Sequence, residues 1–406
     1  MLKRVWIQGY RCFRDVEVEL KPLQVLVGPN GSGKSAFLDA IRFVEDIVRN
    51  GLKKAVERRA RRPDELSWYG KSPHIRFELN WQIPSKESMA LEEAHEIKMI
   101  EIEYELELAL RPSEGDLKIR SEALRVQRGE DGTKICLFNR QGNTARLEPE
   151  HFQPGHIIQL RDEDRTVLSV IISLGHMIVG SSPGLHNLAE WLPDLERWFN
   201  KSWPEFLHPQ PDAIRKATSE LEAESSHRFS PDAHNLALLM EHLKSKYSHA
   251  YNRWIEQICY LIGRKIDLQV RVDEVERTRR IWMRQDDLWV SAAGISDGLL
   301  RFIALTFPAY DPDSAERIFF IEEIENGLSP DAIRLIFDVL VATSDIQWLV
   351  TSHHPLLIHL AGPERLLIFS KDGEEARVIP GNQHPLMLDL RPEDNLSELF
   401  MAGILS

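Results

Sequence analysis

The run GPNGSGKS at residues 28–35 follows the pattern G-x-x-x-x-G-K-S. The five residues before it, LQVLV at 23–27, are apolar enough to form a short buried strand. After it, apolar residues recur at helical spacing up to Asn50-Gly51, which supplies a stop; they are Phe37, Leu38, Ile41, Val44 and Val48. A strand, a glycine-rich loop and a helix in this order predict an α/β fold with a phosphate-binding loop.

The chemistry of this loop predicts nucleotide binding. The glycines allow the backbone N–H groups to face phosphate oxygens, and the helix N-terminus adds a partial positive charge. We expect the Lys34 ammonium to reach the β- and γ-phosphates and the Ser35 hydroxyl to bind Mg²⁺. The predicted nucleotide-binding residues of the loop are Gly28, Pro29, Asn30, Gly31, Ser32, Gly33, Lys34, Ser35 and Ala36.

A pair of carboxylates follows a second apolar stretch far downstream, where residues 317–323 read RIFFIEE. Four large apolar residues in a row predict a buried parallel strand that ends at the carboxyl edge of a sheet, where ligands bind in open α/β proteins. Glu322 is expected to help hold Mg²⁺, and Glu323 to orient and deprotonate the attacking water. The plain alternative is a strand followed by a polar turn.

A further strand is predicted at 346–350, after a helix for which Ser329 is a plausible N-cap. This strand ends in Thr-Ser-His-His-Pro, and a histidine at this edge can sense the γ-phosphate by hydrogen bonding. His353 and His354 are adjacent, so their spacing leaves both open as candidates.

Residues 291–305, SAAGISDGLLRFIAL, predict a second anion site. Ser296 at a helix cap and Gly298 in the first turn leave backbone N–H donors exposed. Taken alone, this is an ordinary capped helix. One chain does not need two γ-phosphate sites, whereas two copies do, because the capped helix of one can close on the nucleotide held by the other.

Together these motifs resemble the ATP-binding-cassette-type ATPases of the SMC, RecF and OLD group, in particular the stand-alone bacterial AAA family ATPases with a RecF-like head. The resemblance covers nearly the whole chain and rests on IQGYRCF (7–13), the phosphate loop, ISDGLLR (295–301), FFIEEIENGLSP (319–330) and LVTSHHPLLI (349–358). It implies a P-loop ATPase head with a mixed sheet, an antiparallel β-subdomain and a helical insertion. It also implies ATP and Mg²⁺ as ligands and a head-to-head dimer around two ATP molecules.

The resemblance assigns roles to individual residues. It places Ser296 and Gly298 in the signature motif and makes His353 the switch histidine. Asn326 and Gly327 fall in the loop that crosses the dimer interface. The predicted catalytic residues are therefore Lys34, Glu323 and His353, and the predicted metal ligands are Ser35, Glu322 and, from the stretch HIIQLRD, Gln159. Departures such as Ile324, where proline is usual, remove no needed functional group.

Three regions are expected: an N-terminal lobe at 1–160, a mainly helical insertion at 161–263 and a C-terminal lobe at 264–406. Alternating residues at 75–83 and 100–110 predict antiparallel strands in the first lobe. The insertion carries Trp191, Trp198 and Trp203, which we interpret as packing residues rather than a base-stacking platform.

The composition predicts a globular protein of the cytoplasm. The N-terminus is too polar for a signal peptide, the apolar stretch 167–180 is too short for a membrane span, and three separated cysteines favour a reducing compartment. The formal net charge of −13 is unfavourable for nucleic acid, so DNA contact requires a local patch. The candidates are residues 53–63 and 276–284, although the favoured interpretation of each is a solvated helix face or loop.

These expectations lead to two functional hypotheses. The leading one is an ATPase that regulates a separately encoded effector, such as a nuclease, in bacterial defence against phage, with assembly beyond the dimer left open. It is motivated by the resemblance, by the lack of a long heptad arm, and by the short stretch after His353, which we judge too short for a nuclease domain. The alternative is a RecF-like repair or recombination ATPase that binds DNA directly. A membrane-transporter motor is disfavoured by the large insertion.

Overall fold

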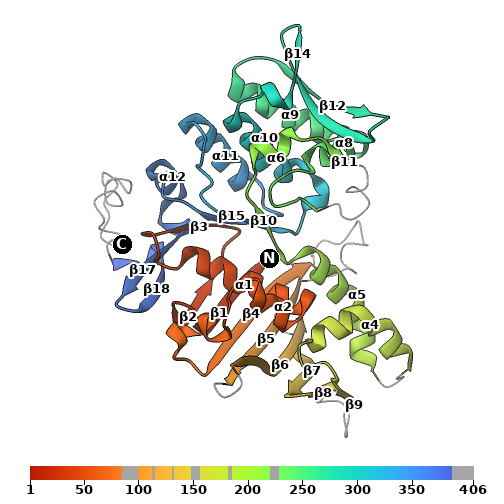
Figure 1. Cartoon of the computed structure of the whole chain (residues 1–406), viewed down its shortest axis with the longest axis vertical. Coiled ribbons are helices and arrows are strands. Elements are labelled where there is room, and N and C mark those ends of the chain that lie inside the picture. The colour runs from red at the N-terminus through yellow and green to blue at the C-terminus, as the bar shows by residue number, and fades with distance from the viewer. Residues whose placement is uncertain are drawn as a thin grey trace.

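The computed structural model describes residues 1–84, 99–111, 115–129, 132–147, 156–181, 185–219 and 228–385 (Figure 1). These residues form three β-sheets and the helices that pack on them, so the fold is α/β, as the sequence predicts. The described helices are α1 (Lys34–Asn50), α2 (Leu52–Glu57), α4 (Val167–Ser181), α5 (His186–Lys201), α6 (Pro211–Arg215), α8 (Leu236–Lys246), α9 (Ser248–Ile262), α10 (Asp297–Tyr310), α11 (Pro330–Ala342) and α12 (Pro355–Arg365).

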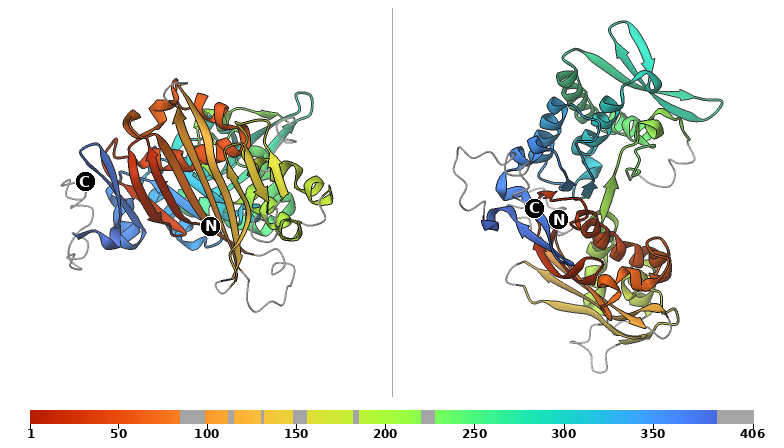
Figure 2. Two further views of the ribbon diagram at one scale, coloured as in Figure 1. Left: turned by 90° about the horizontal axis from the view of Figure 1, so that it is seen from below. Right: turned by 60° about the vertical axis from the view of Figure 1, so that its left-hand side comes forward.

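An eight-stranded antiparallel sheet forms one end of the molecule (Figures 1 and 2). Its strands, in spatial order, are β2 (Phe13–Glu19), β1 (Leu2–Tyr10), β4 (His74–Pro84), β5 (Met99–Arg111), β6 (Asp116–Arg128), β7 (Ile135–Gln141), β8 (Thr144–Leu147) and β9 (His156–Gln159). The pairing of β4 with β5 confirms the antiparallel strands predicted from the alternating residues. In β5 the apolar side chains are buried on one face, because successive residues of a strand point to opposite sides.

A six-stranded sheet crosses the middle of the molecule. Its strands, in spatial order, are β10 (Pro204–Leu207), β15 (Ile318–Ile321), β16 (Gln347–Thr351), β3 (Leu23–Val27), β17 (Leu366–Asp372) and β18 (Glu375–Pro380). All neighbours are parallel except β17 and β18, which form an antiparallel hairpin. Every residue of β3, β15 and β16 is buried, as expected for a parallel sheet covered on both faces.

A smaller antiparallel sheet lies at the opposite end of the molecule from the eight-stranded sheet (Figure 1). It consists of β12 (Ile266–Asp273), β13 (Thr278–Gln285), and the short strands β11 (Thr218–Ser219) and β14 (Leu288–Ser291), both of which pair with β13. Helices α8 and α9 contact this sheet, and its buried residues join the same hydrophobic core as α10 and α11.

The region expected to form one helical insertion, 161–263, is divided between two cores. Helices α4 and α5 pack with α1 and the eight-stranded sheet, whereas α8 and α9 belong to the core of α10 and α11. Between them the chain contributes β10 to the six-stranded sheet. The apolar stretch at 167–180 forms α4, and among the described residues no helix is both long and apolar enough to cross a bilayer.

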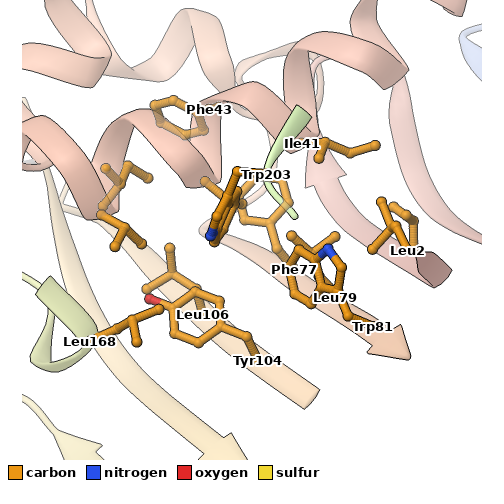
Figure 3. Packing of buried hydrophobic residues seen from close by; sticks show 14 of the residues in the cluster. Leu2, Ile41, Phe43, Phe77, Leu79, Trp81, Tyr104, Leu106, Leu168 and Trp203 are labelled. Carbon is orange, nitrogen blue, oxygen red and sulfur yellow. The ribbon is translucent and has the colours of Figure 1, made fainter. Parts of the chain in front are cut away.

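The core under the eight-stranded sheet is rich in aromatic side chains. Figure 3 shows Ile41 and Phe43 of α1 facing residues of β4 and β5, and the Phe43 and Phe77 ring centroids lie 6.0 Å apart. Trp81 packs against Trp198 and Trp203, with ring centroids 5.0 and 5.1 Å apart. The three tryptophans of the middle region are all buried, which supports the packing interpretation over a base-stacking platform.

A buried polar network joins α4 to this sheet. The Glu122 carboxylate accepts hydrogen bonds from the N–H groups of Val167 and Leu168 at 2.7 and 3.0 Å, and from the Tyr104 hydroxyl at 3.0 Å. The Arg140 guanidinium lies 3.7 Å away, and both charged side chains are fully buried. Burial raises the pKa of Glu122, while these donors oppose that shift. The carboxylate therefore acts as the cap of α4.

We predict that Glu122→Ala strongly destabilises the protein. The change leaves the buried Arg140 charge without its carboxylate partner and two helix N–H groups without their acceptor, a loss worth about 3–5 kcal/mol. Thermal unfolding of the variant would check this. The matched control is Glu374→Ala, which breaks an ion pair with Lys71 whose side chains are each 57% exposed and which costs only about 0–1 kcal/mol. Equal melting temperatures for the two variants would contradict the assignment.

Candidate functional site

The phosphate-loop sequence lies between β3 and α1. Gly28 has a φ of 144°, and a Cβ there would stand 2.1 Å from the Phe369 carbonyl oxygen of β17, so only glycine fits. Gly33, with a φ of 110°, directly precedes α1. Within the loop, the N–H of Ser32 donates to the carbonyl of Pro29 at 3.2 Å. The predicted strand, loop and helix are therefore all present, and the loop has the tight curl that phosphate binding requires.

Lys34 is the first residue of α1 and is 93% buried, since its exposed fraction is 7%. Its Nζ donates to the carbonyl oxygens of Gly28 and Pro29 at 2.7 and 2.9 Å. Burial lowers the pKa of Lys34, and the nearby carboxylates of Glu323 and Glu325 partly offset that shift. The ammonium is thus held inside the loop by neutral acceptors, which is a suitable starting point for binding an anionic phosphate.

One pocket collects the predicted residues from three distant parts of the chain. It lies beside β3, β15 and β16, whose carboxyl ends meet at one edge of the sheet. The predicted residues that line it are Asn30, Gly31, Gly33, Lys34, Ser35, Ala36, Glu322, Glu323 and His353. Sequence reasoning missed three other lining residues, Cys12, His208 and Thr351.

The backbone of Glu323 is strained. It has a φ of 48°, in the left-handed region that non-glycine residues rarely adopt. Its N–H donates to the Thr351 hydroxyl at 2.9 Å, and its carboxylate accepts from the Asn326 amide at 2.7 Å. These contacts fix the carboxylate that sequence analysis assigns to water activation.

The two adjacent histidines have different environments. His353 lines the pocket, and its backbone N–H donates to the Glu325 carboxylate at 2.7 Å. Burial and the Lys34 charge lower the pKa of His353, so its imidazole is neutral at pH 7. His354 instead caps α12, where its ring nitrogen accepts from the N–H of Leu356 at 3.2 Å. The geometry therefore places His353 at the pocket and gives His354 a capping role.

Ser35 and Glu322 bring a hydroxyl and a carboxylate to the same pocket. Oxygen ligands of this kind suit Mg²⁺, which is usually held by one or two protein groups together with phosphates and waters. The described residues contain no cluster of three or more His, Cys, Asp or Glu side chains able to hold a metal alone. The donor set thus fits Mg²⁺ bound with a nucleotide.

Gln159, the third predicted metal ligand, is not at the pocket, and this prediction needs correction. It lies on the edge strand β9, where its exposed side chain hydrogen-bonds the Thr144 hydroxyl at 3.2 Å. His208 lines the pocket instead, because it follows β10 beside Glu322 at the same sheet edge. The available signal was the short stretch PEFL before His-Pro-Gln, which four residues alone do not distinguish from a loop.

Ser296 and Gly298 lie outside the pocket of their own chain. Ser296 is the N-cap of α10, in the β conformation typical of a cap, without a side-chain hydrogen bond to the helix. A Cβ on Gly298 would stand 2.7 Å from the Gly327 carbonyl oxygen. Arg301 of α10 also donates to the Asn326 carbonyl at 2.6 Å. The predicted signature helix, α10, therefore packs closely against the loop that follows the paired glutamates, and it contacts that loop through Gly298 and Arg301.

Comparison with known proteins agrees with this geometry. A family model described as "AAA domain, putative AbiEii toxin, Type IV TA system" matches residues 23–359. The OLD nuclease of Thermus scotoductus (strain ATCC 700910 / SA-01) is 48% identical over 53 residues, which are 13% of this chain and 10% of that protein. The chromosome partition protein Smc of Desulfitobacterium hafniense (strain Y51) is 58% identical over 45 residues, 11% of this chain and 4% of that protein. The matched stretches thus span a tenth or less of these relatives.

A solved structure described as the SmcHead bound to the C-winged helix domain of ScpA is similar over 93% of this chain and 97% of that chain. The TM-score is 0.53 at 14% sequence identity, a likeness that shows the fold alone. Together with the family match over most of the sequence, it shows that the chain belongs to this AAA-domain family of ABC-type, SMC- and OLD-like ATPases.

Proposed function

We propose that this protein is an Mg²⁺-dependent ATPase whose two copies close head to head around two ATP molecules. The observation that carries the proposal is the separation of two anion-binding elements within one chain. Lys34, Ser35 and the paired glutamates meet in one pocket, whereas Ser296 and Gly298 lie outside it, beside Asn326 and Gly327. A second copy can supply the missing helix N-terminus to the nucleotide.

The residues of the pocket have separate roles in ATP hydrolysis. Backbone N–H groups of the loop and the Lys34 ammonium bind the phosphates, so that the terminal phosphate lies near Glu323. Glu323 orients a water and accepts its proton, and neutral His353 donates a hydrogen bond to a γ-phosphate oxygen. Ser35 and Glu322 would hold Mg²⁺, which would supply positive charge beside the phosphates.

Asn326 links hydrolysis to closure. Its amide holds the Glu323 carboxylate, and its carbonyl is held by Arg301 of the signature helix. A partner that contacts this helix therefore also moves the loop that orients the catalytic carboxylate. Nucleotide state is converted in this way into the arrangement of the two heads.

The biological role we propose is control of a separately encoded effector, such as a nuclease, in bacterial defence against phage, within the cytoplasm. The family description, which names a putative toxin and a type IV TA system, supports a role in such a system.

A repair ATPase that binds DNA directly is the alternative, but the first basic segment does not support it. The Arg59 guanidinium, only 6% exposed, pairs with Asp39 and Asp46 at 2.8 and 2.7 Å. Arg58 also pairs with Asp46, and Arg62 pairs with Asp64. Much of the positive charge in this segment is therefore used within the subunit.

The solution mass of Glu323→Gln tests the dimer. The amide keeps the shape of the side chain but cannot accept the proton, so ATP is bound and hydrolysed slowly. We expect the mass to double with Mg-ATP and to stay at that of one chain without nucleotide, as measured by light scattering. Lys34→Ala, which removes the phosphate-binding ammonium, is the control that stays monomeric in both conditions. A monomeric Glu323→Gln protein that binds ATP would overturn the sandwich.

Asn326→Ala is expected to lower kcat about tenfold with little change in KM, because it frees the Glu323 carboxylate to leave its productive orientation. Steady-state ATPase rates would show this, and the light-scattering measurement would confirm that dimerisation is retained. Asn382→Ala removes a similar amide–carboxylate contact, with Glu364, at the surface and serves as the control. A normal kcat for Asn326→Ala would rule out the positioning role.

The effector hypothesis predicts a partner whose binding depends on nucleotide. We expect tagged Glu323→Gln protein, purified from its host with Mg-ATP, to retain one protein that Lys34→Ala does not retain. Deletion of either gene should raise phage plating to the same level. Unchanged plating in both deletion strains would contradict a role in defence, whatever the outcome of the dimer measurement.

A further inference from the structure

The second basic segment, residues 276–284, differs from the first in its secondary structure. It forms β13, whose neighbours β12 and β14 complete a sheet with one covered side. Ile266, Leu268, Ile281 and Met283 point into the core shared with α8 and α9. Because side chains alternate along a strand, the residues between them point away from that core. We call this side the arginine–tryptophan face; it comprises Arg271, Arg280, Trp282, Arg284 and Trp289.

The charges on this face are arranged unfavourably for the folded chain alone. Arg271 and Arg280 are directly opposite each other on β12 and β13, and both side chains are exposed. Like charges in such cross-strand positions destabilise a sheet. Within the described residues, neither guanidinium forms an ion pair with a carboxylate. Unfavourable repulsion between two like charges is expected where a ligand supplies the compensating charge.

Aromatic rings adjoin the two arginines. The Arg271 guanidinium lies 4.2 Å from the ring centroid of Trp282 and 5.0 Å from that of Trp289. Both indoles are half-buried, so part of each remains accessible from the same side. The face thus combines cationic groups with flat π surfaces, the combination that binds a single strand through phosphate contacts and base stacking.

Two acidic residues of the sheet, Asp267 and Asp273, lie on this face, opposite Arg284 and Thr278, and the others lie in the turns. Glu274 and Glu276 lie in the turn between β12 and β13, and Asp286 and Asp287 in the turn between β13 and β14. Arg284, opposite Asp267, is the member of the face whose charge is partly balanced. Arg271 and Arg280 are therefore the cationic groups of the face for which the described residues supply no ion-pair partner, in a chain whose net charge is −13.

We propose that the arginine–tryptophan face binds single-stranded nucleic acid. Arg271 and Arg280 contact successive phosphates, while bases stack on the indoles of Trp282 and Trp289 or on the guanidinium plane between them. The face lies within a single subunit, at the end of the molecule away from the eight-stranded sheet (Figures 1 and 2). The inference therefore does not depend on ATP hydrolysis or on dimer closure.

The test is fluorescence anisotropy of a labelled 20-mer of deoxythymidine with the full-length protein, without nucleotide, at several salt concentrations. We expect Arg271→Gln/Arg280→Gln to weaken binding about tenfold or more, and to reduce the slope of log affinity against log salt by about 1.4, for two lost phosphate contacts. Lys53→Gln/Lys54→Gln removes the same charge from two exposed lysines elsewhere and should leave affinity within about twofold.

A second variant tests stacking. Trp282→Phe/Trp289→Phe should retain binding and lose the tryptophan quenching caused by the oligonucleotide, with unchanged ATPase activity and melting temperature showing that the fold is intact. Three results would overturn the proposal: no binding by the unmodified protein at 50 mM salt, equal losses in the two glutamine double variants, or tighter binding of polyglutamate than of the oligonucleotide at matched charge. The last would identify an acidic polypeptide as the ligand instead.

Discussion

Parallel pairing of three buried strands is the constraint on which the site depends. Val25 of β3, Val350 of β16 and Ile321 of β15 are in register, so the residues that follow these strands reach one sheet edge. The phosphate loop, the paired glutamates and His353 meet there although they are far apart in sequence. A slip in this register would move these groups apart. The Phe369 carbonyl of β17 lies so close to Gly28 that no side chain fits there.

The strained backbone of Glu323 holds a carboxylate in a fixed position at this sheet edge. A positive φ at a non-glycine residue costs about 1–3 kcal/mol and persists only where neighbouring contacts require it. Thr351 holds the backbone N–H and Asn326 holds the carboxylate, so strand β16 and the following loop determine the position from two sides. Because Asn326 is also bound by Arg301, and Gly298 leaves space for the Gly327 carbonyl, helix α10 and the Glu323 carboxylate are parts of one packed unit.

Sequence reasoning predicted the position of a residue correctly where that residue belongs to one strand–loop–helix unit. The phosphate loop, β15 with its glutamates, and the Ser329 cap of α11 are all of this kind, and each has a local pattern. It failed where position depends on non-local pairing. The four residues of β10 carry no strand signal of their own, yet their pairing with β15 brings His208 to the pocket. Gln159, which was predicted to lie there, is instead on the edge strand of the eight-stranded sheet. The division of residues 161–263 between two cores has the same cause, because both halves contain ordinary amphipathic helices.

The two arginine-rich segments show how secondary structure decides the use of charge. Arg59 follows α2, which packs against α1, and there it meets Asp39 and Asp46 on the helix surface. In β12 and β13, alternation sends the apolar residues to the core and places Arg271 and Arg280 side by side on the other face. In the first segment the positive charge forms ion pairs with the neighbouring helix, whereas in the second segment it is concentrated on the surface of a sheet. Similar composition therefore has opposite consequences, and the period of the backbone, two residues in a strand, determines which guanidinium groups remain for a partner.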